Sequence, residues 1–160
     1  MLRISLFIMV LCGLLASCES PPAYVFVEEI PNGEWPAEKR FGGEFEVTDT
    51  INPHHFYVTL RNTEDYKNSN LFLFLHTHFP NGRKSKDTIE CVLTDRYGRW
   101  LGSGNGFIVD HKVITNKVMY RYQKKFPLSG TYSFEIEHAM RTDTLHEILD
   151  VGVRIERVSK

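Results

Sequence analysis

The histidines are the first residues of this sequence that could do chemistry. His76 and His78 lie two residues apart, so on a strand both side chains would point to the same side. Together with His54 or His55 they could form a three-histidine zinc site. However, His76 is in phase with Phe74, and no carboxylate neighbours the pair in the sequence. We therefore interpret these residues as ordinary strand histidines and expect no metal site.

Two further patterns imitate catalytic motifs. The segment His146–Asp150 has the spacing of a zinc-protease helix, with Asp150 in place of the second histidine. That motif needs a stable helix, and a strand pattern already begins at Val151. The glycine-rich run Gly102–Gly106 precedes no helix that could present its N-terminus to a phosphate, and Ser103 stands in no nucleophile elbow. We predict a bulge or loop there, and we expect no enzymatic activity, cofactor or small-molecule substrate.

A turn with two large aromatic residues is the next candidate. Tyr97 and Trp100 follow Asp95 in a segment whose Gly98 indicates a turn. The two rings and the carboxylate could bind a sugar, or the segment could be a hairpin with cross-strand aromatic packing. For a protein partner, we expect the contact to be either an exposed strand edge or the hairpin with Tyr97 and Trp100.

The amino terminus carries the strongest chemical signal. A short positive segment precedes an apolar run from Ile4 to Leu15, too short to cross the ~30 Å of bilayer hydrocarbon as a helix. The run ends in Leu-Ala-Ser-Cys, like a bacterial lipobox, whose cysteine receives a diacylglycerol. The alternatives are a plain secretory signal with a chance cysteine and a buried core helix. We expect residues 1–17 to be a lipoprotein signal peptide and residues 18–23 to be a tether lipidated at Cys18, anchored stably by several acyl chains.

This interpretation leaves one cysteine, Cys91, in the body of the protein and hence no intramolecular disulfide. Cys91 is in phase with Ile89 and Leu93 on a predicted strand. We expect it to be a small buried residue rather than a nucleophile.

Composition places the rest of the chain among globular proteins. The 160 residues are 42% hydrophobic with a net charge of -1, and a nucleic-acid binder would need a basic surplus. Residues 19–65 contain ten acidic and three basic groups, whereas residues 66–160 contain ten acidic and fifteen basic groups. This asymmetry indicates either a solvated mixed surface or opposite potentials that suit docking between envelope proteins. Residues 24–160 are long enough for a single domain with its own core.

Alternation of apolar and polar residues with period two dominates that domain and predicts strands. The predicted strands cover residues 24–29, 43–48, 54–62, 71–79, 87–95, 118–126, 131–137 and 151–158. One short helical turn is expected near residues 143–150, where Thr144 and Glu147 resemble a capping box. The predicted fold is all-β, an antiparallel β-sandwich of jelly-roll-like form.

The second half of the chain resembles the gliding-motility lipoprotein H (GldH-like) family of the Bacteroidetes. The residues that carry the resemblance lie in four motifs, Asp95-x-x-Gly-x-Trp-Leu-Gly-x-Gly-x-Gly106, Gly130-x-Tyr-x-Phe-x-Ile-Glu137, Ala139-Met-Arg-x-Asp-x-Leu145 and Ile148-x-Asp-Val-Gly-Val-Arg-Ile-Glu156. The resemblance implies a non-enzymatic lipoprotein of the cell envelope that works with other proteins of a gliding-motility or secretion machinery. It offers no catalytic residue to transfer, and only lipidation at Cys18 is carried over.

One of these motifs also has a structural interpretation. Arg141 is close enough in sequence to pair with Asp143 or Asp150. We predict a buried ion pair that holds the helical turn against the last strand, where removal of one partner would cost about 3–5 kcal/mol.

Overall fold

The computed structural model describes residues 21–108 and 111–158. The elements of these residues are β1 (Tyr24–Glu29), a 3-10 turn η1 (Pro31–Gly33), β2 (Glu34–Pro36), β3 (Phe41–Val47), β4 (His54–Thr63), β5 (Asn70–His78), β6 (Lys84–Val92), β7 (Ser103–Ile108), β8 (His111–Lys124), β9 (Gly130–His138), β10 (Thr144–His146) and β11 (Ile148–Arg157). The prediction of an all-β antiparallel sandwich is confirmed.

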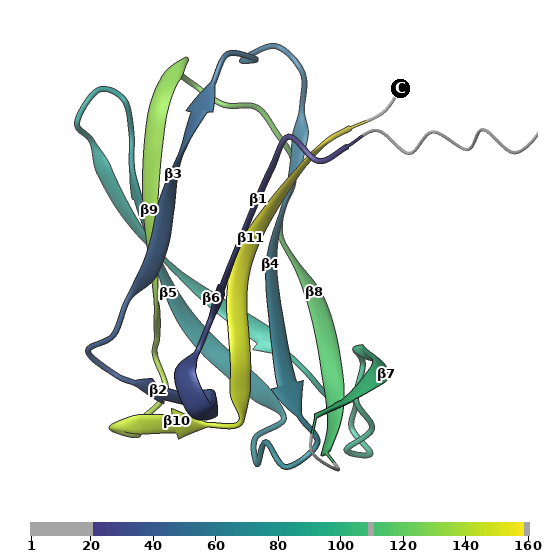
Figure 1. Cartoon of the computed structure of the whole chain (residues 1–160). Coiled ribbons are helices and arrows are strands. Elements are labelled where there is room, and N and C mark those ends of the chain that lie inside the picture. The colour runs from purple at the N-terminus through teal and green to yellow at the C-terminus, as the bar shows by residue number, and fades with distance from the viewer. Residues whose placement is uncertain (1–20, 109–110, 159–160) are drawn as a thin grey trace, which may run out of the picture.

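Two sheets form the sandwich, and a short ribbon closes one end (Figure 1). The first sheet has the strand order β1-β11-β4-β8-β7, and the second has the order β3-β9-β5-β6. The first long strand pairs with the last, β1 with β11, and the following pairs are β3 with β9, β4 with β8 and β5 with β6. This nesting is that of one long hairpin rolled up, which is the jelly roll.

The core lies between the sheets because inward positions alternate with outward ones along each strand. On β5, Leu71, Leu73 and Leu75 are buried, and on β9 the inward residues Tyr132, Phe134 and Ile136 are buried. Burial of these side chains is the main favourable term in folding. The alternation that predicted the strands from sequence is therefore the alternation that fills the core.

The largest error in the predicted strand boundaries concerns β8. This strand begins at His111, well before the predicted start at Val118. The interior position Asn116 breaks the apolar pattern, and its Nδ2 donates a 2.8 Å hydrogen bond to Oδ1 of the buried Asn62 on β4. Two buried polar side chains that hydrogen-bond to each other are stable inside the sandwich. In the sequence, however, such a polar residue interrupts the apolar alternation and therefore predicts a loop. The irregularity expected at Gly102–Gly106 is confirmed, because the register of β7 shifts between Ser103 and Gly106.

The helical turn predicted near residues 143–150 is wrong. The segment forms β10 and the start of β11, and the one short helical element of the described residues is η1. Leu145 is buried because it lies opposite Trp35 in the β2–β10 ribbon, and the chain then turns into β11 at Glu147, whose φ is 69°. The three residues of β2 end in a proline and carry little strand signal. The sequence therefore shows no sign of the strand that pairs with β10.

Candidate functional site

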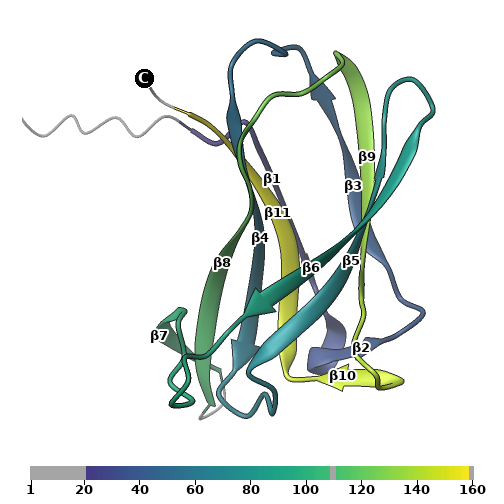
Figure 2. The ribbon, with the colours of Figure 1, turned by 180° about the vertical axis from the view of Figure 1, so that it is seen from behind.

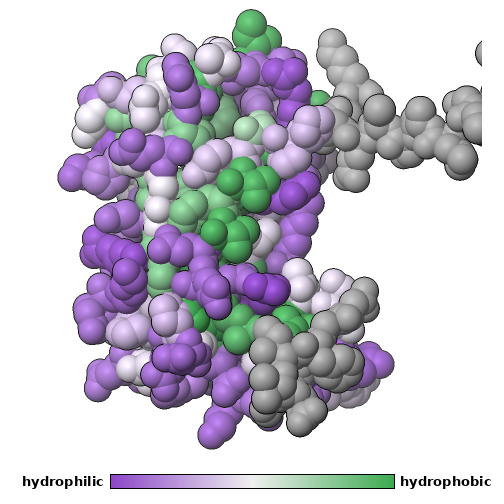
Figure 3. All heavy atoms as spheres, viewed as in Figure 1, coloured by the Kyte–Doolittle hydropathy of each residue, from purple (hydrophilic) through white to green (hydrophobic). Residues whose placement is uncertain are grey.

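The outer edge of β1 is the most distinctive surface for binding a partner. As the first strand of its sheet, β1 leaves one edge without a neighbour. Its outward residues Val25 and Val27 are 47% and 55% exposed. Figure 3 shows hydrophobic residues over this strand on a face that is otherwise mainly polar. An exposed apolar edge strand is a template onto which another chain can add a strand.

The two edges of the second sheet carry charge instead. The outward positions of β3 include Glu44 and Glu46, and those of β6 include Lys84 and Lys86. Charged side chains on an edge strand are a common protection against unwanted pairing. Compared with these two edges, residues 24–27 of β1 lack that protection, and its charged residues Glu28 and Glu29 stand only at its end. Its run of consecutive apolar residues at 24–27 is the sequence signal that could have identified it.

Gly152 on β11 lets β1 pair this closely. A Cβ at this position would lie 2.2 Å from the carbonyl oxygen of Phe26. Inward, Phe26 and Tyr24 pack their rings edge-on against Phe134 of the opposite sheet, with centroids 5.2 and 6.1 Å away. The inner face of β1 is therefore fixed to the core while its outer face stays open.

The Tyr97 loop, residues 95–101, joins β6 to β7 and lies at the end of the sandwich away from the start of β1 (Figures 1 and 2). The carboxylate of Asp95 accepts hydrogen bonds from the backbone N–H groups of Tyr97 at 2.8 Å and Arg99 at 3.0 Å, and from Nε of Arg99 at 2.7 Å. These donors lower the pKa of Asp95, against the opposing effect of desolvation. These contacts add to the backbone hydrogen bonds from the N–H of Asp95 to the carbonyl of Arg99 and from the N–H of Gly98 to the carbonyl of Asp95, which close the turn.

The two aromatic residues of this loop do not form one platform. The Tyr97 side chain is 67% exposed, but its ring contacts the guanidinium groups of Arg96 and Arg99, whose Cζ atoms are 4.6 and 5.3 Å from the centroid. Trp100 is half-buried against the core and pairs with Thr94 in an isolated bridge. This geometry gives no support to sugar binding. An exposed tyrosine beside two arginines has the composition of a protein-binding hot spot, and a role for Tyr97 and Trp100 in partner binding stays a prediction.

The ion pair predicted for Arg141 is formed by a different arginine. Asp150 is buried on β11, and its carboxylate pairs with Nε of Arg61 on the adjacent strand β4. Arg141 and Asp143 are both exposed in the turn between β9 and β10. Proximity in sequence suggested Arg141, but the sheet brings the residue opposite Asp150, Arg61, to the carboxylate.

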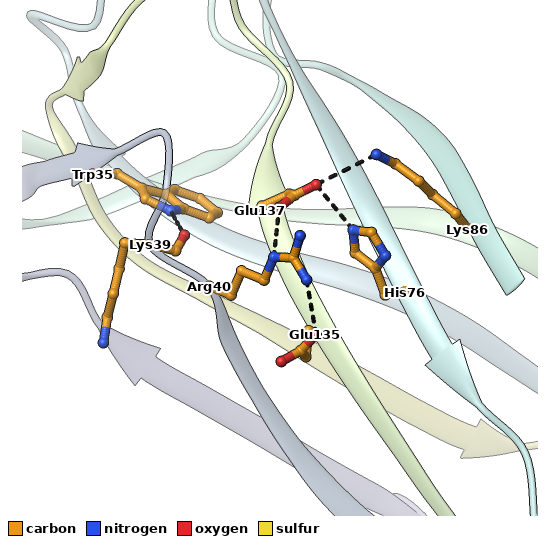
Figure 4. A network of polar contacts seen from close by, with 7 residues as sticks. All are labelled: Trp35, Lys39, Arg40, His76, Lys86, Glu135 and Glu137. Atoms are coloured by element: carbon orange, nitrogen blue, oxygen red, sulfur yellow. Dashed lines mark hydrogen bonds and ion pairs between the residues drawn. The ribbon is translucent and has the colours of Figure 1, made fainter. Parts of the chain in front are cut away.

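A second polar network surrounds Glu137 on the outer face of the second sheet (Figure 4). Its carboxylate accepts hydrogen bonds from Nε of Arg40 at 2.6 Å and Nε2 of His76 at 2.9 Å, with Nζ of Lys86 at 3.5 Å. Desolvation alone would raise the pKa of Glu137, but the bonds from His76 and Arg40 outweigh it and lower the pKa. No carboxylate neighbours His76 in the sequence, but the fold places Glu137 beside it.

This network joins three strands rather than forming a metal centre. Within the described residues, no group of three His, Cys, Asp or Glu side chains could hold a metal ion. Cys91 is fully buried, and burial raises the pKa of its thiol to about 12. The expectation that Cys91 is a small buried residue is confirmed, and its lack of reactivity stays a prediction.

The fold and these surfaces define a class, namely a jelly-roll domain with an apolar edge strand and ion-paired sheet faces. The sequence profile of the GldH lipoprotein family matches residues 23–155. The chain therefore belongs to the GldH lipoprotein family. It is 34% identical over 151 residues to the "Gliding motility lipoprotein GldH homolog" of Christiangramia forsetii, covering 90% of this chain and 89% of that protein.

A second relative supports the same assignment. The chain is 28% identical over 151 residues to the "Gliding motility lipoprotein GldH" of Flavobacterium johnsoniae, covering 90% of each chain. Among solved structures, a chain titled "Structure of infectious bursal disease virus Gx strain" aligns with 11% identity and a TM-score of 0.26, over 89% of this chain and 34% of the viral one. That TM-score is too low to bear on the fold.

The family assignment links the chain to gliding motility and to lipoproteins. Cys18 and the predicted signal peptide 1–17 lie outside the described residues, so lipidation stays a prediction. None of the helices in the part of the chain that the structure describes is long and apolar enough to span a membrane.

Proposed function

We propose that this chain is an envelope lipoprotein, anchored through Cys18, that serves as a non-enzymatic component or assembly factor of a gliding-motility or secretion machinery. It binds other envelope proteins through the outer edge of β1. The observation that carries the proposal is the exposure of Val25 and Val27 on an edge strand while the edges of β3 and β6 carry charge. A partner that adds a strand there gains main-chain hydrogen bonds and covers both valines.

The position of this edge suits an anchored protein. β1 begins at Tyr24, six residues after Cys18, and an extended chain of that length spans at most about 20 Å. The proposed interface thus begins within that distance of the anchor. A partner embedded in or attached to the same membrane can reach it without a long linker.

Crosslinking in intact cells tests the proposal. A photoreactive amino acid replaces Val25 or Val27 on the β1 edge, and the matched controls replace Glu44 on β3 or Lys84 on β6. The Tyr97 position is included as the second candidate surface. We expect defined crosslinked complexes with other envelope proteins at Val25 and Val27 and far less at the two controls.

Introduction of a charge at the edge provides the functional control. Val27→Lys places a charge on the outer face of β1, which blocks strand addition without touching the core. We expect the complexes to disappear while the unfolding temperature of the variant stays unchanged. Equal crosslinking at all four edge positions, or complexes that persist in a folded Val27→Lys variant, would contradict the assignment of this edge.

A further inference from the structure

A cavity of about 360 Å³ lies between the two sheets. Its wall is mainly apolar and includes the rings Phe45, Phe56, Phe79, Phe126 and Tyr132 together with Ile155. Several of these rings contact one another, with centroids 5.1 Å apart for Phe56 and Phe126 and 5.4 Å for Phe126 and Tyr132. The volume is in the range of small-molecule pockets, about 300–1,000 Å³.

The cavity exists because inward side chains become small and polar along β5 and β6. The inward positions of β5 run from leucines at 71, 73 and 75 to Thr77, which lies opposite Ser85 of β6. On β6 the inward positions change from Cys91 and Ile89 to Asp87 and Ser85. Side chains of this size cannot fill the space between two sheets packed about 10 Å apart. The replacement of large apolar residues by small or polar ones at the inward positions is visible in the sequence.

Figure 2 shows the side on which β6 of one sheet approaches β8 of the other. The cavity wall includes Asp87 of β6 and Tyr120 and Arg121 of β8, which places an opening on this side. At this opening Nη2 of Arg121 lies 3.2 Å from Oδ1 of Asp87, and the phenol of Tyr120 hydrogen-bonds to the same carboxylate. Burial and this carboxylate raise the pKa of Tyr120 to about 12, so its proton stays in place. The opening is therefore framed by a fixed polar bridge between the sheets.

The rim also carries two lysines, Lys124 and Lys125, that take no part in this polar bridge. Lys124 and Lys125 line the cavity at the end of β8, and neither forms an ion pair with another described residue. Asp87 is the one carboxylate of the cavity wall, and Arg121 already pairs with it. The rim therefore has a net positive charge that is available to an anionic group.

The cavity lies at the end of the sandwich where β1 begins. Tyr24 is opposite Ile155, Ile155 is opposite Phe56, and Phe56 is opposite Arg121, in one row across the first sheet. If Cys18 is lipidated as proposed above, this end lies within about 20 Å of the membrane anchor. The cavity and its charges are independent of that anchor.

An acyl chain fits this arrangement better than a peptide does. The interior offers few polar groups beyond Thr77, Ser85 and Tyr120, so the N–H and C=O groups of a peptide would be left without partners at a large cost. A hydrocarbon chain has no such groups. If each carbon atom of the chain takes about the 30 Å³ that a water molecule occupies in the liquid, the volume holds a chain of roughly twelve carbon atoms.

We propose that this inter-sheet cavity binds a single acyl chain whose anionic head, a carboxylate or a phosphate, lies against Lys124 and Lys125. Such a ligand buries its chain among the aromatic rings and leaves its head at the solvent-facing rim. The site is separate from the outer edge of β1 and does not depend on the partner proposed for that edge.

Photolabelling of the full lipidated chain in isolated membranes tests the proposal. The probe is a twelve-carbon fatty acid with a diazirine near its methyl end, and mass spectrometry locates the labelled peptides. We expect saturable labelling of peptides that contain Phe56 or Phe126, with competition by dodecanoate and by dodecyl phosphate but not by dodecanol. Lipids extracted from the purified protein then distinguish a free fatty acid from a phospholipid as the natural source.

Two kinds of variant separate the cavity from its rim. Thr77→Phe and Ser85→Phe fill the cavity from β5 and from β6, and each should reduce labelling at least tenfold. Lys124→Gln combined with Lys125→Gln should raise the half-saturating concentration of the probe about tenfold. The control, Lys39→Gln with Lys67→Gln, removes the same charge at the opposite end and should have no effect. Unfolding temperatures show which variants are folded.

The rim variant keeps the test decisive even where a filling variant fails to fold, because both lysines are exposed. Labelling that does not saturate, that persists in a folded Thr77→Phe or Ser85→Phe variant, or that ignores the two lysines would overturn the proposal. Competition by an apolar peptide, but not by dodecanoate, would also overturn it and would assign the cavity to a protein partner.

Discussion

Asp150 of β11 and Arg61 of β4 form an ion pair across two neighbouring strands of the first sheet. The aspartate side chain is only 5% exposed, whereas the arginine side chain is 45% exposed. The pair lies next to the shift in register between Ile148 and Asp150, where the chain enters β11 from the corner at Glu147. The ion pair therefore holds β11 against β4 at the point where their regular pairing begins.

Loss of Arg61 should destabilise the fold, because it leaves a buried carboxylate without its partner. We expect Arg61→Ala to lower the free energy of unfolding by about 1–3 kcal/mol, the cost of an unsatisfied buried charged group with partial solvent access. Arg141→Ala, at an exposed position, should change it by less than about 0.5 kcal/mol. A double-mutant cycle with Asp150→Asn in urea unfolding measures the coupling, and equal losses for the two arginines would refute this assignment.

Two buried histidines should make stability depend on pH. His54 and His138 are 3% and 4% exposed, and desolvation lowers the pKa of each below the usual 6.5. Below about pH 6.5 these histidines bind protons in the unfolded chain but stay neutral in the folded chain. The free energy of unfolding therefore falls as the pH falls. Each histidine can contribute up to about 1.4 kcal/mol per pH unit.

The window from about pH 6.5 to 4.5 isolates this effect. The carboxylates whose pKa is lowered, among them Glu137 and Glu156, lose their contribution only as the pH falls below the usual value near 4.5. Urea unfolding across the window should show a slope that His138→Phe reduces by about half. His146→Gln, at a side chain that is 63% exposed, is the control. A flat profile in the unmodified chain would rule out the histidine contribution.

Asp95 should control the order of the Tyr97 loop. Asp95→Ala removes the acceptor for the backbone N–H groups of Tyr97 and Arg99. We expect the amides of these two residues to exchange their hydrogens about tenfold faster or more, because local opening no longer breaks two bonds to a carboxylate. Amides of β4 and β11 should be unaffected. Unchanged exchange in the loop would mean that its turn geometry, not Asp95, holds it.

Cys91 should report on unfolding. Its thiol is fully buried and its pKa is raised to about 12, so neither access nor the thiolate needed for alkylation is present in the folded chain. We expect iodoacetamide at pH 8 to modify the Cys91 peptide only at the rate of unfolding, and rapidly in denaturant. Fast modification under native conditions would show that β5 and β6 separate without global unfolding.

The sequence by itself determined the class of fold and the family. Period-two alternation located eight strands, because the same alternation decides which side chains are buried between two sheets. The pair Asn81-Gly82 between two predicted strands also indicates a turn, and the structure has one there, since Gly82 has a φ of 80° and the N–H of Phe79 bonds to the carbonyl of Arg83. Local chemistry was sufficient for these features because each depends on neighbours along the chain.

Only the tertiary structure decided the contacts between distant segments. The strand at Thr144–His146 exists because β2 pairs with it, and Asp150 is neutralised by Arg61 rather than by Arg141 because β4 lies beside β11. Glu137 reaches His76 for the same reason. The jelly roll pairs residues that are far apart in the chain, so the charge partners follow from strand order and register, which a local pattern does not encode. The apolar run of β1 and the small inward residues of β5 and β6 are visible in the sequence, but only the strand order makes the first an edge and the second the wall of a cavity.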